Sequence, residues 1–299
     1  MMLPSAHSAG IAFESFGEEA NETILLIAGL GTTMLRWSVP FCERLAARGY
    51  RVIRFDNRDS GRSAHFSSFP PPDFGELARV LMAGEQPTVP YTLADMAADA
   101  ITLLDRLGIA RAHVAGRSMG GMIAQITASD YPARVLSLTS IMSSTGNPAL
   151  PQAAPGIMAL MMRPVPVPAA DLDGFLEHGV AFARCIAGSG APFDAAAHRT
   201  LLLEELKRGH APGGAARQVA AMAVSGDRRA RLRTIAVPAL VIHGAEDPLI
   251  PSAGGVETAA MIPDAELLLI EGMGHDIPAQ FEGRIADAIH QTARKGATA

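Results

Sequence analysis

Residues 112–121 read AHVAGRSMGG and give the strongest indication of the fold. An apolar run precedes Gly116, and a helix-compatible segment, GMIAQITA at 121–128, follows Gly120. A strand, a tight turn and a helix with a serine at the apex form a nucleophile elbow. The turn directs the Ser118 hydroxyl away from the sheet and places it at a helix N-terminus, where free N–H groups favour a developing oxyanion.

A motif this short also arises by chance in ordinary glycine–serine turns, so the prediction of a nucleophile also depends on finding a base and an acid elsewhere in the sequence. A serine hydroxyl needs a base, and the base needs a group that orients it. Asp247 follows the apolar segment VIHG at 241–244, and His275 ends the segment GMGH that follows the next apolar run. Ends of adjacent parallel strands face one crevice, so the three side chains can meet. Glu246 is the competing acid.

Strand-like and helix-like segments alternate along most of the chain. Thr92 to Leu107 has helical periodicity, with Thr92 as the N-cap, and 23–28 is continuously apolar like a central strand. Alternation of this kind predicts a mostly parallel sheet flanked by helices. The expected strands are 11–16, 23–28, 51–55, 112–115, 135–141, 239–243 and 267–270, and the last helix is expected at about 278–293.

The alternation stops between about 144 and 233, where no strand pattern occurs. Helices are expected there near 171–187, 195–209 and 213–224. We therefore expect a core made of residues 1–143 and 234–299 and a helical lid made of 144–233. Three methionines of this segment are either lid core or a pliable substrate wall: Met158, Met161 and Met162.

Composition narrows the functional classes. The 299 residues carry a net charge of −5 with a pI near 6.0, which gives no support for nucleic-acid binding. No signal-peptide pattern and no apolar run of ~18 residues is present, so we expect a cytoplasmic protein without a membrane partner. Cys42 and Cys185 lie outside metal-binding spacings, and no metal or organic cofactor is expected. The sequence leaves the oligomeric state open.

Four motifs together resemble one superfamily over nearly the whole chain. They are AGLG at 28–31, DNRDSGRS at 56–63, GRSMGG at 116–121, and GAEDP at 244–248 with Gly274-His275. The chain resembles serine hydrolases of the α/β-hydrolase fold, which place serine, acid and histidine in this order. The DNRDSGRS block and the stretch through Trp37 resemble esterases like aclacinomycin methylesterase. The elbow is also similar to those of enol-lactonases and ring-cleavage C–C hydrolases.

The resemblance implies a role for each matching residue. Ser118 would be the nucleophile, His275 the base and Asp247 the group that orients the histidine. The backbone N–H groups of Leu30 and Met119 would form the oxyanion hole. Trp37, with the three lid methionines, is a candidate substrate contact.

These roles predict a serine carboxylesterase that hydrolyses a hydrophobic carboxylic ester, a small-molecule partner, through an acyl-enzyme. A lactonase, a C–C bond hydrolase or a cofactor-free perhydrolase could use the same triad. A ligand receptor on a degraded hydrolase scaffold is the remaining alternative, because fold alone does not fix function.

Other charged and polar residues have structural interpretations. Asp56 and Arg58 are expected to form an ion pair beside the histidine loop. Arg117, next to the predicted nucleophile, is expected to pair with an acid. His113 and His243 lie on predicted strands and are expected to be satisfied core histidines.

Overall fold

The computed structural model describes residues 10–161 and 163–297. Its centre is a seven-stranded sheet in the order β1-β3-β2-β4-β5-β6-β7. Only β1 runs antiparallel to its neighbour, and every other pair is parallel. The predicted fold class, a mostly parallel sheet flanked by helices, is confirmed. The strands are β1 (Phe13–Phe16), β2 (Thr23–Ile27), β3 (Arg51–Phe55), β4 (Ala112–Arg117), β5 (Val135–Ile141), β6 (Ala239–Gly244) and β7 (Glu266–Ile270).

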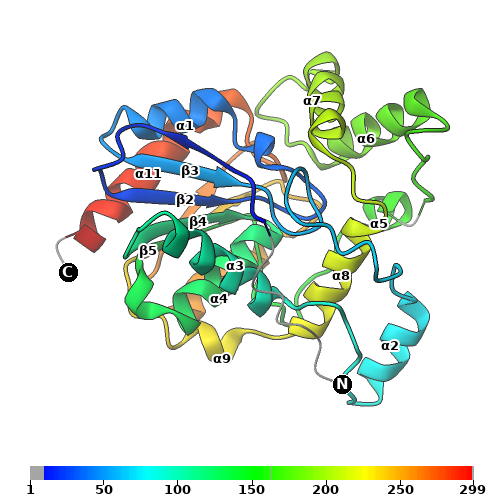
Figure 1. The fold of residues 1–299 in the computed structure, drawn as a ribbon, viewed down its shortest axis with the longest axis horizontal. Coiled ribbons are helices and arrows are strands. Elements are labelled where there is room, and N and C mark those ends of the chain that lie inside the picture. The colour runs from blue at the N-terminus through cyan, green and yellow to red at the C-terminus, as the bar shows by residue number, and fades with distance from the viewer. Residues whose placement is uncertain (1–9, 162, 298–299) are drawn as a thin grey trace.

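Burial distinguishes the central strands of the sheet from its two edges. Every residue of β2 to β6 is buried, whereas the two edge strands, β1 and β7, are partly exposed. Helices α1 (Val39–Ala46) and α11 (Ala279–Ala297) cover one face (Figure 1). Helices α3 (Leu93–Arg106) and α4 (Met119–Asp130) cover the other, with the short α9 (Arg229–Leu232) packed on α4 and α10 (Ala253–Met261) packed on α9 and β6. Each face therefore has its own apolar core.

Helix α3 illustrates how the sequence defines an element. Thr92 accepts a hydrogen bond from the Asp95 N–H, and the Asp95 carboxylate accepts one from the Thr92 N–H, which completes a capping box. A cap of this kind contributes about 1 kcal/mol. The predicted N-cap is thus confirmed, and the apolar face of the helix lies against the sheet.

The chain between β5 and β6 contains helices and, among its described residues, no strand. Three of these helices, α6 (Leu172–Ile186), α7 (Ala195–Arg208) and α8 (Gly214–Ser225), match the ranges predicted from the sequence. Together with α5 (Pro155–Met161) they gather beyond the carboxyl ends of the strands (Figure 1).

Several shorter elements were not predicted. They include α2 (Phe74–Met82), α5 and α10, and the single turns η2 (Met34–Arg36) and η3 (Pro132–Arg134). No helix in the described part of the chain combines the length and the apolar character that crossing a membrane requires.

Candidate active site

Ser118 follows β4 directly and occupies the N-cap position of α4 with φ 56° and ψ −124°. A positive φ is unusual for serine and strains the backbone. Neighbouring glycines allow the turn: a Cβ on Gly116 would lie 2.0 Å from the Gly120 oxygen, and one on Gly120 would lie 2.3 Å from the Ile27 oxygen. The structure therefore has the strand, turn and helix of the predicted elbow.

Three side chains from three strand ends form one hydrogen-bonded chain. Ser118 Oγ lies 3.0 Å from His275 Nε2, and His275 Nδ1 lies 2.7 Å from Asp247 Oδ2. Because a carboxylate only accepts, the proton between His275 and Asp247 sits on Nδ1, and Nε2 is left to accept from the serine hydroxyl. The structure brings together the three residues of the predicted triad.

Asp247 is held as an anion despite its burial. Burial by itself raises the pKa of this carboxyl. The charge of His275 and hydrogen bonds from His243, His275 and the Ile250 N–H oppose burial and lower the pKa to about 2. Its Oδ1 accepts from the N–H groups of Leu249 and Ile250, each at 2.9 Å.

The competing acid, Glu246, lies in a different environment. Its carboxylate is exposed and accepts hydrogen bonds from the N–H and the hydroxyl of Ser189. These two bonds lower its pKa. Glu246 therefore points away from His275, and the geometry favours Asp247.

The backbone N–H groups of Leu30 and Met119 are the predicted oxyanion donors. A Cβ on Gly29 would lie 3.4 Å from the Ser118 Cβ, so the loop that carries Leu30 packs directly against Ser118. Asn57 Nδ2 donates to the Ala28 oxygen at 2.9 Å and fixes the start of this loop. In the described part of the chain, the N–H groups of Leu30 and Met119 donate to no protein acceptor. Both are free to bind a ligand oxygen.

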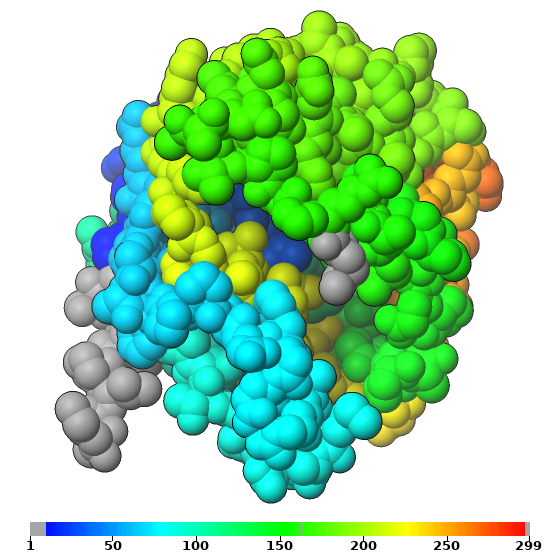
Figure 2. All heavy atoms as spheres, turned by 90° about the vertical axis from the view of Figure 1, so that its right-hand side faces the viewer, coloured from blue at the N-terminus to red at the C-terminus, as the bar shows by residue number. Residues whose placement is uncertain are grey.

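Ser118 and His275 line a cavity of about 500 Å³. Figure 2 shows a hollow on this side of the molecule, between green atoms of the segment after β5 and cyan atoms around α2, with blue and yellow atoms in its depth. Its apolar wall includes two predicted residues, Met158 and Met161, together with Phe182, Ile186, Leu202 and Met222. The third methionine, Met162, lies outside the described residues.

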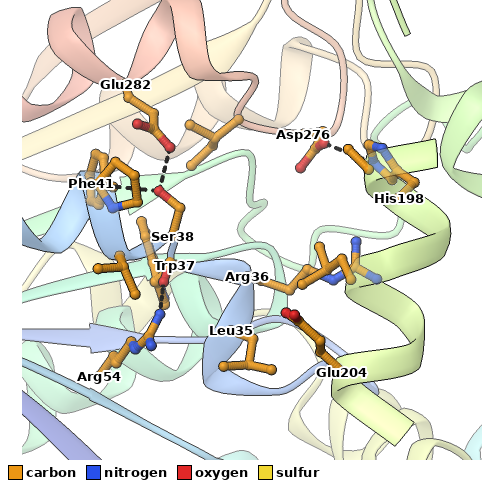
Figure 3. A pocket seen from close by; sticks show the side chains of 15 residues that line it. Leu35, Arg36, Trp37, Ser38, Phe41, Arg54, His198, Glu204, Asp276 and Glu282 are labelled. Atoms are coloured by element: carbon orange, nitrogen blue, oxygen red, sulfur yellow. Dashed lines mark hydrogen bonds and ion pairs between the residues drawn. The ribbon is translucent and has the colours of Figure 1, made fainter. Parts of the chain in front are cut away.

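Trp37 does not line this cavity, and its predicted place as a substrate contact is corrected. The indole is 1% exposed and stacks on Phe41 with ring centroids 5.3 Å apart. It lines a second cavity, of about 420 Å³, together with Ser38 and Glu282 (Figure 3). The apolar sequence around Trp37 gives it a place in the core between α1 and the sheet.

A cluster of charged groups separates the two cavities, and the sequence did not predict it. Arg36, His198 and Asp276 line both cavities. Asp276 Oδ1 lies 3.0 Å from Arg117 Nη2. Asp276 Oδ2 lies 3.3 Å from His198 Nε2 (Figure 3). Burial raises the pKa of Asp276, but the His198 hydrogen bond and the charges of Arg117 and Arg36 bring it well below its usual range. The prediction that Arg117 pairs with an acid is confirmed.

This cluster joins helix α7 to the residues beside the triad, because Arg117 precedes Ser118 and Asp276 follows His275. Helix α7 is tied a second time through Glu205, which binds Arg36 at 2.7 Å. Helix α6 contacts the loop that carries His275 and Asp276, since its Ile186 oxygen accepts a hydrogen bond from the His275 N–H at 2.7 Å. Adjacency to the triad was the one sequence signal for Asp276.

The predicted Asp56–Arg58 ion pair is wrong. Arg58 forms a two-pronged pair with Asp99 of α3, at 2.6 and 2.7 Å. Asp56 instead binds Arg208 at 2.8 Å and accepts from the Met34 and Arg62 N–H groups. Neighbouring residues of this loop point in different directions, so each finds its partner on a different helix.

Comparison with known proteins agrees with the fold and the site. The model of the α/β hydrolase fold family matches residues 22–184. The chain belongs to the α/β-hydrolase fold family. Rhodomycin D methylesterase DauP of Streptomyces sp. (strain C5) is 33% identical over 92% of both chains, and rhodomycin D methylesterase DnrP of Streptomyces peucetius is 33% identical over 92% of both. The chain is a carboxylic ester hydrolase and resembles these methylesterases, as the sequence predicted.

Solved structures support the fold alone. A meta-cleavage product hydrolase from Pseudomonas fluorescens superposes with a TM-score of 0.74 at 18% identity, covering 97% of this chain and 96% of the other. An enol-lactonase from Burkholderia xenovorans gives a TM-score of 0.66 at 21% identity, covering 99% of both chains.

Proposed function

We propose that this protein is a serine carboxylesterase that works through a Ser118–His275–Asp247 triad. The observation that carries the proposal is the continuous chain from Ser118 Oγ to Asp247 Oδ2, with links of 3.0 and 2.7 Å. Nucleophile, base and orienting acid within hydrogen-bond reach are what nucleophilic catalysis by a neutral hydroxyl requires.

The reaction has two halves. Ser118 Oγ attacks the ester carbonyl carbon while its proton passes to His275 Nε2, and the Leu30 and Met119 N–H groups bind the resulting oxyanion. The carbon–oxygen bond to the alcohol then breaks, and the departing oxygen takes the proton from His275. Water repeats both steps on the acyl-enzyme, which releases the carboxylic acid and restores Ser118.

The substrate is proposed to be a hydrophobic carboxylic ester. Methionine, phenylalanine, leucine and isoleucine side chains dominate the wall of the 500 Å³ cavity beside Ser118. The names of the two relatives described above, both methylesterases, support a methyl ester as the bond that is broken.

Residues 144–233 are proposed to form a lid, and 1–143 with 234–299 the catalytic core. The segment supplies Met158, Met161, Phe182 and Leu202 to the cavity but none of the three triad residues. This division assigns substrate choice to the lid and chemistry to the core.

A change of one oxygen atom tests the central claim. Ser118→Ala should abolish ester turnover and labelling by a fluorophosphonate, while circular dichroism and the unfolding midpoint stay close to those of the parent. Labelling that persists in the variant would show that another residue is the nucleophile.

A substrate panel tests the reaction class. We expect p-nitrophenyl esters of several chain lengths and the methyl ester of a bulky aromatic acid to turn over faster than a lactone or a vinylogous diketone. Preference for the lactone or the diketone would move the assignment to a lactonase or a C–C bond hydrolase. Binding without turnover of any compound would point to a receptor.

A further inference from the structure

A second histidine lies beside the acid of the proposed triad. His243 belongs to β6, and its side chain is fully buried. Its Nε2 lies 2.8 Å from the Ile250 oxygen and 3.4 Å from Asp247 Oδ2. The proposed reaction does not use the His243 imidazole, although this ring contacts the carboxylate that orients His275.

The surroundings of the ring fix its tautomer. Both close neighbours of Nε2 are oxygens that only accept, so Nε2 carries a proton. Within the described residues, Nδ1 has no hydrogen-bond partner. Helix α10 closes that side, because a Cβ on Gly255 would lie only 2.5 Å from Nδ1. The ring is therefore clamped with its N–H directed at the turn that carries Asp247.

That turn holds Asp247 through Ile250. The Ile250 N–H donates to Asp247 Oδ1 at 2.9 Å, and the oxygen of the same residue accepts from His243. With Oδ1 fixed by backbone donors, Oδ2 is the atom presented to His275 at 2.7 Å. His243 thus contacts both the turn and the reactive oxygen of the carboxylate.

We propose that His243 is a positioning residue for the esterase reaction: its Nε2–H fixes the turn at 247–250 and supports Asp247 so that Oδ2 faces His275. The inference rests on the proposed role of Asp247 in the triad. A buried carboxylate is stable as an anion only when hydrogen-bond donors surround it. Residues that contact a catalytic group and are themselves held by packing keep that group in its productive geometry.

Two substitutions separate the donor from the bulk of the ring. His243→Asn places its amide near the position of Nδ1, whereas His243→Gln can place an N–H near that of Nε2. We expect His243→Asn to lower kcat about tenfold, because it loses the hydrogen bond to the Ile250 oxygen and the contact with the Asp247 carboxylate, with little change in KM. His243→Gln should recover most of that loss.

Two further readouts report on the carboxylate. Without the donor dipole near Oδ2, the carboxylate attracts the proton on His275 more strongly. The acid limb of the kcat/KM profile should therefore move to higher pH in His243→Asn. The downfield proton resonance of the His275–Asp247 hydrogen bond should shift in the same variant. Other charged groups near His275, namely Asp276, Arg117, Arg36 and His198, are unchanged in these variants.

His113 provides a matched control. It is a buried histidine on β4, 2% exposed, and its Nδ1 lies 2.9 Å from Ser137 Oγ. His113→Asn and His113→Gln should lower stability without moving the acid limb or the downfield resonance. The proposal is overturned if His243→Asn keeps the parent's limb and resonance, or if His243→Gln is as impaired as His243→Asn.

Gly255→Ala gives a second approach if the His243 variants do not fold. The added methyl would push on the imidazole from α10, so the acid limb and the resonance should move although every atom of His243 is kept. Gly283→Ala, where an added methyl meets no atom within 4 Å, is its control. A Gly255→Ala enzyme with the parent's limb and resonance would contradict the proposal.

Failure of the proposed function is distinguishable from failure of this inference. A parent protein without ester turnover and without fluorophosphonate labelling refutes the esterase proposal. The downfield resonance needs no substrate, so it still shows whether His243 supports the His275–Asp247 hydrogen bond.

Discussion

The floor and the roof of the cavity beside Ser118 are built differently. The floor consists of strand ends and helix α4, in which every residue from Met119 to Ala128 is buried. The roof consists of α5 to α8, and α7 contains no buried residue at all. Packing fixes the floor, whereas polar links, Arg36–Glu205 and Asp276–His198, attach α7. Precise chemistry is expected where packing fixes atoms, and adjustable selectivity where it does not.

The largest expected effect lies in the floor. Asp247→Asn should lower kcat by about 10⁴-fold, as the same change does in serine proteases, because an amide favours the wrong tautomer of the histidine. Steady-state kinetics on a p-nitrophenyl ester measures it. Glu246→Gln is the matched control and should cost far less, since Glu246 binds Ser189 at the surface. If Glu246→Gln were the inactive variant, the two acids would have exchanged roles.

A buried ion pair at the base of the roof should affect stability rather than chemistry. Arg217 of α8 binds Asp59 with two bonds of 2.7 and 2.8 Å, and both side chains are at most 1% exposed. Arg217→Leu leaves a buried carboxylate unpaired, so we expect a loss of about 3–5 kcal/mol in the free energy of unfolding. Urea denaturation measures the loss.

The exposed pair between Arg199 and Asp173 is the comparison for that result. Both side chains are solvated, so Arg199→Leu should change the free energy of unfolding by less than about 1 kcal/mol. Equal losses in the two variants would mean that burial does not distinguish the base of the roof from its outer surface.

Acid should weaken the attachment of the roof. The pKa of Asp276 is lowered in the folded protein, so its contribution to stability is present above the unfolded value near 3.9 and is lost as the pH falls below it. We expect the unfolding free energy to fall between about pH 4 and pH 2. Asp276→Asn should flatten this dependence. Parallel curves for the parent and Asp276→Asn would contradict the assignment.

The smallest effect on chemistry is expected at the roof's apolar side chains. Met158→Ala and Met161→Ala widen the cavity. The ratio of kcat/KM between long-chain and short-chain esters should change several-fold, while turnover of a small acetate ester changes little. If the variants lose stability but keep the ranking, these methionines pack within the lid and do not contact substrate.

The sequence predicted the parts of this molecule that depend on local pattern. A continuous apolar run identified β2, and Thr92 as the N-cap identified the start of α3. Ser118, Asp247 and His275 could be found because each follows a strand, and ends of parallel strands converge. The glycine-flanked turn around Ser118 was the most informative of these signals.

Long-range side-chain partners were not predictable from the pattern. Asp56 pairs with Arg208 and Arg58 with Asp99, because the partner depends on which way each side chain leaves the loop. Trp37 lines a second cavity and not the one beside Ser118, because packing between α1 and the sheet determines its position. The short helices α2 and α5 lack the several turns over which helical periodicity becomes clear.

The attachment points of the segment between β5 and β6 have an evolutionary consequence. The Arg228 N–H donates to the Thr145 oxygen at 2.8 Å, so the two ends of this helical segment lie side by side. An insertion whose ends meet this closely can be lengthened, shortened or replaced at little cost in loop entropy, while the sheet stays intact. Under the proposed assignment of substrate choice to this segment, exchanging one contiguous stretch of gene would transfer specificity between relatives.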